Sequence, residues 1–237
     1  MNTIKRVLVT GGTGFVGHWM ERTQPESIKA VFLSNHDYYH SYWERQQWDA
    51  IAHLAPISPF DVLHYGSEVR VLFASSGAVY DGQTEYAVNK RRWEKDCAES
   101  GADCVIARLF TFVGAHLKNQ YAITNFIEDA RKGGPIRVLG DGNAVRTYLY
   151  GDDLGRWMWK ILLEGHGIYD VGSGKEYTIL EVARAVASVL PSSINILNTM
   201  GIPSSHYVPD ITRALEIGCK ETVGLLQAIK RTIDEAE

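Results

Sequence analysis

The stretch "IKRVLVTGGTGFVG" (residues 4–17) constrains the fold more than any other part of the chain. Its first seven residues are an apolar, β-branched run of the kind that forms a buried parallel strand. Gly11, Gly14 and Gly17 follow at intervals of three, directly before a predicted helix. Such glycines permit a tight turn, a close approach to a pyrophosphate and tight packing of helix on strand. The stretch therefore predicts a dinucleotide-binding fold. A glycine triplet without this context could also be a flexible turn, which is the alternative interpretation.

Further apolar runs alternate with helical patterns along the chain. The predicted strands cover residues 28–34, 48–56, 69–76, 103–110 and 167–172. The predicted helices cover 84–99, 123–134, 152–165, 178–190 and the C-terminal segment, and Thr178 with Glu181 forms a capping box. This alternation implies βαβ units. We therefore predict an α/β protein with a Rossmann-like, doubly wound parallel sheet.

The later helices break the βαβ rhythm and predict a second, smaller domain. We expect residues 1–115 and 147–172 to form the dinucleotide-binding domain. Residues 116–146 and 173–237 are expected to form a small, discontinuous and mostly helical substrate-binding lobe.

Composition narrows the function classes. The formal net charge of −4 favours neither a nucleic-acid partner nor an acidic membrane. The three cysteines, Cys97, Cys104 and Cys219, lack the spacing of a metal site, and their odd number argues against a disulfide framework. We expect no metal site, no membrane segment or signal peptide, and a location in the reducing cytoplasm.

The segment "SSGAVYDGQTEYAVNK" (75–90) supplies candidate catalytic groups. Tyr86 and Lys90 share one face of the predicted helix, so the ammonium can lower the pKa of the phenol. A tyrosine tuned in this way can exchange a proton with a substrate alcohol. Ser76 ends the fourth predicted strand, at the sheet edge where such folds bind ligands, and can hydrogen-bond the same oxygen. The alternative interpretation is that Tyr86 is an ordinary surface or core aromatic residue and that Ser76 is a turn residue.

At this point the chain resembles the extended short-chain dehydrogenase/reductase superfamily, in its NAD(P)-dependent nucleotide-sugar epimerase/dehydratase branch. The resemblance covers nearly the whole chain and depends on several motifs in order. They lie at residues 8–17, 49–55, 75–81, 86–90, 107–116, 140–154 and 169–183.

The resemblance implies a role for each matching residue. Ser76, Tyr86 and Lys90 would be the catalytic residues. The residues that would contact NAD or NADP are Gly11, Thr13, Gly14, Phe15, Val16, Gly17, Ser34, Asn35, Leu54, Ala55, Tyr86, Lys90, Phe110 and Val113. The residues that would contact a nucleotide sugar are Ser76, Thr111, Asn125 and Arg146, of which Arg146 would bind the diphosphate. The alternative interpretation is that Arg146 is a surface arginine with no role in binding. Ser34 and Asn35 hold the position of the usual ribose-binding acid, so the choice between NAD and NADP stays open.

The chain also departs from the family pattern. The interval between Ser34 and Asp49 is too short for the helix–strand–helix passage usual there, so we expect the sheet to lack one edge strand. The helix between Pro56 and Val69 is expected to be short. The resemblance also implies a homodimer, which this shortened helix would weaken. Trp93 is expected near the centre of the dimer interface or packed beneath it, and the alternative is that Trp93 is plain intramolecular core.

The residues after Ser76 bear on the reaction. The 4,6-dehydratases of this branch carry an Asp-Glu pair there, and this chain has Gly77 and Ala78, so dehydration is not expected. The first hypothesis is a nucleotide-sugar epimerase that transfers a hydride transiently, at C4 of the sugar. The alternatives are an NAD(P)H-dependent nucleotide-keto-sugar reductase and, from another class, an inactive cofactor-binding sensor or scaffold.

Overall fold

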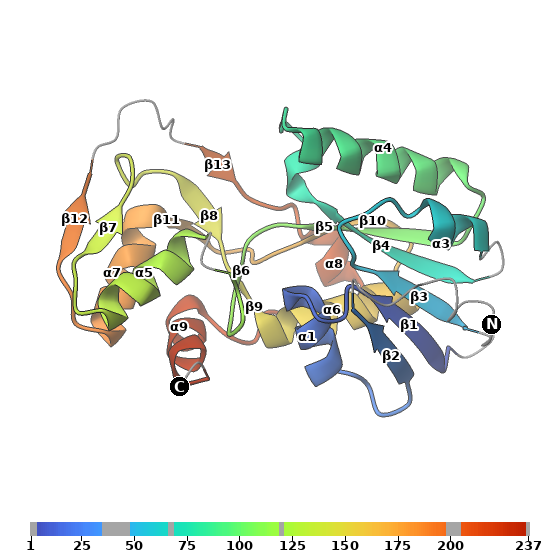
Figure 1. The fold of residues 1–237 in the computed structure, drawn as a ribbon, viewed down its shortest axis with the longest axis horizontal. Coiled ribbons are helices and arrows are strands. Elements are labelled where there is room, and N and C mark those ends of the chain that lie inside the picture. The colour runs from blue at the N-terminus through green and yellow to red at the C-terminus, as the bar shows by residue number, and fades with distance from the viewer. Residues whose placement is uncertain (1–3, 35–47, 66–68, 119–120, 198–204, 236–237) are drawn as a thin grey trace. The chain divides into compact units, whose positions relative to one another are not determined.

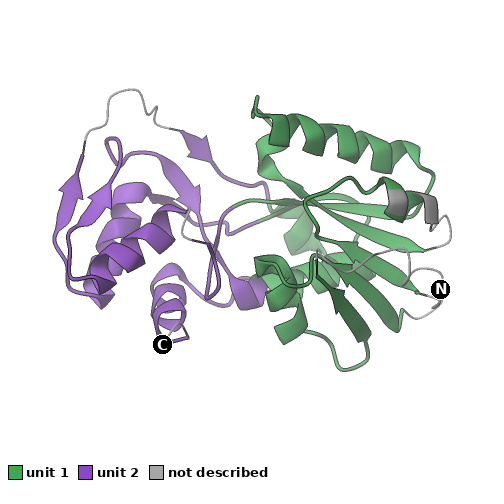
Figure 2. Cartoon of the chain, in the orientation of Figure 1, with its two compact units in different colours: residues 1–110, 154–171, 211–220 green, residues 111–153, 172–210, 221–237 purple. Residues whose placement is uncertain are grey.

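The structure is a computed structural model, which describes residues 4–34, 48–65, 69–118, 121–197 and 205–235. The chain forms two compact units, shown in different colours in Figure 2. Unit 1 comprises Met1–Phe110, Leu154–Val171 and Ile211–Lys220, and unit 2 comprises Thr111–Asp153, Gly172–Asp210 and Glu221–Glu237. Residues 211–220, expected in the lobe, thus lie in unit 1. Residues 111–115, 147–153 and 172, expected in the dinucleotide-binding domain, lie in unit 2.

Unit 1 is built on a parallel sheet whose strands come from the predicted apolar runs. The sheet has six strands in the order β10-β5-β4-β3-β1-β2, and each neighbouring pair is parallel. The strands are β1 (Arg6–Thr10), β2 (Lys29–Leu33), β3 (Ala50–His53), β4 (Arg70–Ser76), β5 (Cys104–Leu109) and β10 (Gly167–Val171). The predicted α/β class with a parallel sheet is therefore confirmed. The segment in which we expected an edge strand to be missing, residues 35–47, lies outside the described residues.

Helices lie on both faces of this sheet, as a doubly wound fold requires. α3 (Phe60–Tyr65) and α4 (Glu85–Glu99) lie on one face, and α1 (Phe15–Arg22) and α6 (Gly151–Glu164) lie on the other (Figure 1). α6 packs directly on α1, since a Cβ added at Gly155 would lie only 2.2 Å from the backbone oxygen of Trp19. α3 has six residues, in agreement with the short helix expected there.

The strands are apolar along their length because both faces are covered. All seven residues of β4 are buried. Leu8, Ile51 and Phe73, from three adjacent strands, form one core cluster with Val62 of α3 and Cys97 of α4. This buried sheet fixes the strand ends from which the candidate site residues project.

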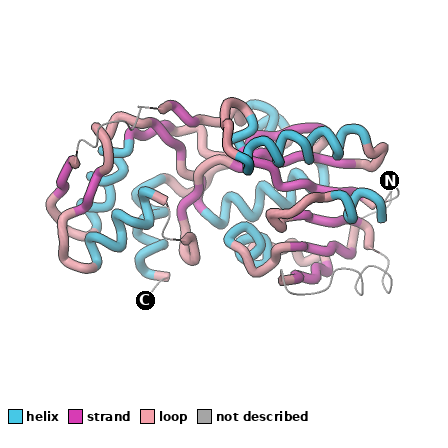
Figure 3. The backbone as a smooth tube through the Cα atoms, turned by 45° about the horizontal axis from the view of Figure 1, so that its top comes forward, coloured by secondary structure: helices cyan, strands magenta, loops and turns pink. Residues whose placement is uncertain are grey.

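Unit 2 combines helices with very short strands, which Figure 3 shows along the chain. Its helices are α5 (Ala122–Arg131), α7 (Ile179–Val189) and α9 (Leu225–Asp234), and α7 contacts both others. The predicted capping box between Thr178 and Glu181 begins α7. The strands are β6 (Phe112–Val113), β7 (Ile136–Val138), β8 (Val145–Thr147), β9 (Leu149–Tyr150), β11 (Glu176–Thr178), β12 (Ile194–Ile196) and β13 (His206–Tyr207).

The remaining helix, α8 (Thr212–Glu216), belongs to unit 1 and contacts β10. Across the described part of the chain, none of the helices has the length and apolar character needed to span a bilayer.

Candidate active site

The glycine loop after β1 meets the segment after β3 at the carboxyl edge of the sheet. β1 lies between β2 and β3, so the strand order reverses here, and open α/β sheets bind ligands at such a point. Gly11 has φ +70°, and a Cβ added to it would lie 2.8 Å from the backbone nitrogen of Ala55 and 3.0 Å from the carbonyl carbon of Leu54. The structure thus brings together three residues that we expected to contact the cofactor.

The other glycines of the loop fit the same role. A Cβ at Gly17 would lie 2.3 Å from the backbone oxygen of Gly12, so only glycine lets α1 approach the loop so closely. Gly14 is the N-cap of α1 and supplies no side-chain acceptor, which leaves first-turn N–H groups available to an anion. Phe15 and Val16, in that first turn, are half-buried, whereas Thr13 is exposed. This cradle fits the pyrophosphate of a dinucleotide.

The end of β2 lies beside the loop. The backbone N–H of Gly12 donates to the carbonyl of Leu33 at 2.8 Å, and Ser34 follows Leu33 as a half-buried residue. Ser34 is therefore close to the cradle, and Asn35 lies outside the described residues. The choice between NAD and NADP stays open.

The three candidate catalytic residues come from β4 and α4. Ser76 is the last residue of β4, and its Oγ accepts a hydrogen bond from the backbone N–H of Ala78 at 3.2 Å. This contact caps a single 3₁₀ turn, Gly77–Val79, directly after the strand. Tyr86 lies in the first turn of α4 with half of its surface exposed, and Lys90 lies one turn later with only 3% exposed. The phenol is accessible to a ligand, and the ammonium is inside the unit.

Lys90 connects the helix with the strand that carries Ser76. Its Nζ donates to the carbonyl of Ala74, two residues before Ser76, at 2.6 Å. The same atom lies 4.7 Å from the ring centroid of Phe73, 5.2 Å from that of Trp93 and 5.8 Å from that of Tyr86. A cation at these distances interacts favourably with aromatic rings. The structure thus brings the ammonium within range of the phenol ring, as the predicted pair requires.

Burial changes the acidity of this lysine. Removal from water disfavours the ammonium and lowers the pKa of Lys90 to about 8, while the negative charge of Glu94 opposes that shift. A lysine of this kind changes its charge close to neutral pH, which is rare for an exposed lysine.

A buried ion pair next to Lys90 was not predicted from the sequence. Glu94 accepts a hydrogen bond from Ser75 Oγ at 2.5 Å and two from Arg108, from Nε at 3.0 Å and from Nη2 at 2.7 Å. These contacts join α4 to β4 and β5. Two signals could have revealed the pair: Arg108 is a charge within an apolar run, and Glu94 follows Lys90 by one helical turn. A buried charge of this kind needs a partner.

The network continues to the strand at the edge. The guanidinium of Arg108 lies 4.7 Å from the ring centroid of Tyr80, whose hydroxyl donates to the carboxylate of Asp170 at 2.9 Å and 3.1 Å. Burial and the Asp170 carboxylate raise the pKa of Tyr80, although Arg108 opposes this. The network holds the turn after Ser76 against β10.

The remaining predicted residues divide between the units. Phe110 is the last residue of the first segment of unit 1, and it is buried with its N–H donating to the carbonyl of Val171. Thr111 and Val113 begin unit 2, where the carbonyl of Thr111 accepts from the N–H of Leu149 at 3.1 Å and Val113 is buried in β6. Phe110, Thr111 and Val113 thus follow directly after β5, which ends at Leu109.

The two predicted substrate residues of unit 2 lie on different elements. Asn125 is exposed on α5. Arg146, on β8, is half-buried and donates to the carbonyl of Ser205 at 3.1 Å and to its Oγ at 2.9 Å. Its guanidinium also lies 5.8 Å from the ring centroid of Tyr207 on β13. Ser205 and Tyr207 were not predicted, because nothing in the sequence links them to Arg146.

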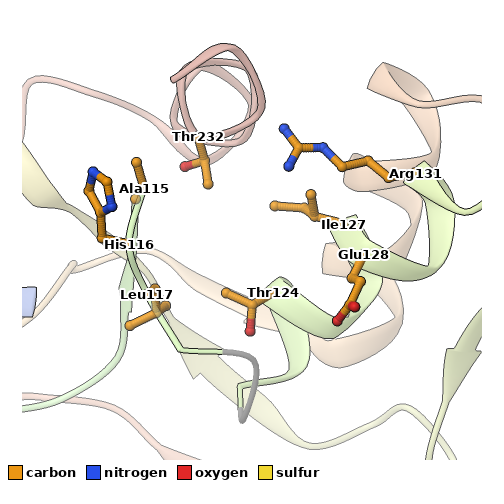
Figure 4. Close-up of a pocket in the computed structure, with 9 residues that line it drawn as sticks. Ala115, His116, Leu117, Thr124, Ile127, Glu128, Arg131 and Thr232 are labelled. Atoms are coloured by element: carbon orange, nitrogen blue, oxygen red, sulfur yellow. The ribbon is translucent and has the colours of Figure 1, made fainter. Parts of the chain in front are cut away.

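Unit 2 also contains a cavity of about 280 Å³ that holds none of the predicted site residues (Figure 4). It lies among the loop 114–117, α5 and α9. Arg131, one of its lining residues, donates to the carbonyl of Ile233 at 2.5 Å and so caps the end of α9. We do not assign this cavity to the candidate active site.

Comparison with known proteins agrees with this geometry. Residues 60–172, which include all three candidate catalytic residues, match the model of the NAD dependent epimerase/dehydratase family. Among curated proteins, UDP-glucuronic acid decarboxylase 2 of Arabidopsis thaliana is 24% identical over an alignment that covers 94% of this chain and 66% of that protein. UDP-glucuronic acid decarboxylase 1 of Danio rerio is also 24% identical, with 97% of this chain and 72% of that protein covered. The chain thus spans about two thirds of the length of these relatives.

Solved structures share the fold over the whole chain. The UDP-glucose 4-epimerase of Thermus thermophilus, in complex with NAD, has a TM-score of 0.83 at 20% identity, with 98% of both chains covered. The UDP-glucuronic acid 4-epimerase of Bacillus cereus, also in complex with NAD, has a TM-score of 0.82 at 18% identity with the same coverage. The Rossmann-like fold expected from the sequence is confirmed by these structures, and the match of residues 60–172 agrees with the expected family resemblance.

Proposed function

Because residues 60–172 match the model of the NAD dependent epimerase/dehydratase family, we propose that this chain is an NAD(P)-dependent nucleotide-sugar epimerase. The proposed reaction is transient hydride transfer at one sugar carbon, C4, with return of the hydride to the opposite face. The observation that carries the proposal is the buried Lys90 ammonium, 5.8 Å from the Tyr86 ring centroid and bonded to the strand that ends at Ser76.

Each of the three residues has a distinct task. Tyr86 takes the proton from the sugar hydroxyl, because its phenol is accessible and the nearby ammonium favours the phenolate. Ser76 hydrogen-bonds the same oxygen and orients it. Lys90 supplies the charge that tunes Tyr86 and is the residue expected to bind the nicotinamide ribose. The bound NAD(P) would supply the hydride acceptor, and the glycine cradle with Ala55 would hold it.

The proposed substrate is a nucleoside diphosphate sugar. Arg146 is the residue expected to bind its diphosphate, because a guanidinium offers several fixed donors to phosphate oxygens. Thr111 and Asn125 are proposed as further substrate contacts. Gly77 and Ala78 carry neither an acid nor a base, which argues against dehydration as the reaction.

Two related reactions are alternatives. A reductase would use external NAD(P)H once and release it oxidised. Decarboxylation of a nucleotide-linked uronic acid is suggested by the curated relatives, which are named UDP-glucuronic acid decarboxylases. An inactive cofactor-binding scaffold is the alternative from another class.

A substrate panel distinguishes these functions. The purified chain is first examined for retained cofactor by its absorbance, and then incubated with UDP-glucose, UDP-galactose and UDP-glucuronic acid in the presence of NAD or NADP. We expect the C4 epimer without net cofactor consumption. Release of CO2, or net oxidation of NADPH with keto-sugars, would identify an alternative reaction. Cofactor binding without turnover of any sugar would favour the scaffold, and Tyr86→Phe is the matched control for chemistry that depends on the phenol.

A further inference from the structure

Two cysteines of unit 1 line one cavity, which includes none of the candidate catalytic residues among its lining. Cys97 is in the last turns of α4, and Cys104 is the first residue of β5. Both line a cavity of about 480 Å³. Its other lining residues are Arg91, Glu94, Lys95, Ala98, Ile106, Gly167 and Ile168. The cavity is large enough to admit a small organic molecule.

The two thiols interact directly and differ in exposure. Cys97 belongs to the core cluster of unit 1, and Cys104 packs against that cluster. A hydrogen bond with Cys104, together with burial, raises the pKa of Cys97. Cys97 is 2% exposed, whereas Cys104 is half-buried. Cys97 therefore keeps its proton in the reduced protein, and Cys104 is the thiol that a reagent in the cavity meets first.

The charges around the cavity favour an anionic reagent. Arg91 and Lys95 are the cations of the lining and Glu94 is its carboxylate, and Lys95 is itself paired with Glu99 at 3.6 Å. Arg91 is therefore the cation that an anionic reagent would meet. Arg91 is held in place, because it donates to the carbonyls of Val79 at 3.1 Å and Gly82 at 2.8 Å. The carboxylate of Glu94 is already paired with Arg108 at 2.7 Å, so it contributes little repulsion.

We propose that Cys97 and Cys104 form an oxidation site, at which an anionic low-molecular-weight disulfide of the glutathione class generates an intrachain disulfide. The Cys104 thiolate attacks one sulfur of the reagent, forms a mixed disulfide and releases one thiolate. The Cys97 thiol then gives its proton to solvent as its sulfur attacks that of Cys104, which breaks the mixed disulfide, forms the protein disulfide and releases the second thiolate. The two released thiolates take up the two protons that the cysteines lose. Two protein thiols are oxidised and one reagent disulfide is reduced to two thiols.

The disulfide would tether the end of α4 to the start of β5. α4 also carries Tyr86 and Lys90, so the modification acts on the helix of the candidate active site. The proposal itself does not depend on the reaction that the protein catalyses.

Thiol mapping tests the proposal on the full chain. The reduced protein is incubated with oxidised glutathione, alkylated under denaturing conditions and digested with trypsin. No lysine or arginine lies between the two cysteines, so both fall in the peptide Asp96–Arg108, while Cys219 falls in Ala214–Lys220. We expect free thiols to decrease from three to one, with peptide 96–108 lighter by two hydrogens and resistant to alkylation.

Matched variants identify the order of attack. Cys97→Ala should stop at a glutathione adduct on Cys104, Cys104→Ala should leave Cys97 unmodified, and Cys219→Ala should behave as the parent protein. The proposal is overturned if peptide 96–108 keeps two alkylatable thiols, if the oxidised product is a covalent dimer, or if Cys219 reacts as readily as the pair.

Discussion

The burial of Lys90 predicts a specific dependence of stability on pH. The pKa of this lysine is lowered to about 8 in the folded protein, because its ammonium is removed from water, and an unfolded chain restores the ordinary value of about 10.4. Between these values the unfolded state binds more protons than the folded state. The buried ammonium therefore destabilises the fold fully below about pH 8. This destabilisation is relieved, and the free energy of unfolding increases, as the pH rises from about 8 to 10.5.

The magnitude follows from the size of the shift. A difference of one pKa unit corresponds to about 1.4 kcal/mol, so this shift corresponds to about 3 kcal/mol in total. Most of that difference is expressed between pH 7 and pH 10. Solvent screening reduces this difference little, because Lys90 is only 3% exposed.

The assay is urea unfolding of the parent protein and of Lys90→Met at several pH values from 7 to 10. The free energy of unfolding of the parent, minus that of the variant, should increase by roughly 2–3 kcal/mol over this range. Other groups that titrate in this range cancel in the difference. Lys95→Met, on the same helix but with 71% of its side chain exposed, is the control and should give a curve parallel to the parent. Parallel curves for the parent and Lys90→Met would refute the claim that burial penalises the ammonium.

The remaining predictions concern catalysis, substrate binding, packing and assembly. Tyr86→Phe should reduce turnover at least about 100-fold and leave NAD(P) affinity nearly unchanged in titrations, and substantial remaining activity would remove the phenol from the mechanism. Arg146→Ala should weaken nucleotide-sugar binding by about 1.5–3 kcal/mol in calorimetry without changing NAD(P) affinity, and equal sugar affinity would remove Arg146 from the site. Glu94→Ala should destabilise the fold by about 3 kcal/mol in urea, because the half-buried Arg108 loses its partner, whereas Glu94→Leu combined with Arg108→Met should recover most of that loss. Sedimentation over a concentration series should detect a weak homodimer, and an active monomer at every concentration would contradict it.

The strands and the glycine loop could be predicted because their causes are local. A strand buried on both faces must be apolar along its length, and all six predicted strands of the sheet are present within a few residues of their expected ends. Gly11 and Gly17 could be predicted because a Cβ at either position would contact backbone atoms, and no other residue avoids that contact.

Other features depend on contacts between distant segments, which no local pattern reports. The strands of unit 2 have two or three residues each, too few to show alternation. Residues 211–220 belong to unit 1, where Arg213 donates to the carbonyls of His166 and Ile168 at 2.7 Å and 2.8 Å. The sequence contains an arginine there but no indication of its acceptors.

The position of Trp93 also depends on contacts that the sequence does not report. We expected it either at a dimer interface or as intramolecular core. It is half-buried, packs against the core cluster of unit 1 and makes an edge contact with Phe73, with ring centroids 6.4 Å apart. These contacts agree with the intramolecular alternative, and the dimer stays a prediction.

The environment of Lys90 bears on the choice between an enzyme and an inactive scaffold. The ammonium is almost fully buried, yet its described hydrogen bond is to one carbonyl, that of Ala74, and its other close neighbours are aromatic rings. Such an arrangement lowers stability by about 3 kcal/mol at neutral pH relative to an unperturbed lysine, a substantial part of what a domain of this size possesses. Departures from good packing and pairing of this kind are expected at functional sites. A scaffold that only binds a cofactor could use Lys90 to bind the nicotinamide ribose, but that role alone does not require the ammonium to be held out of water beside an accessible phenol. The position of Lys90 therefore favours a protein in which that charge acts on Tyr86.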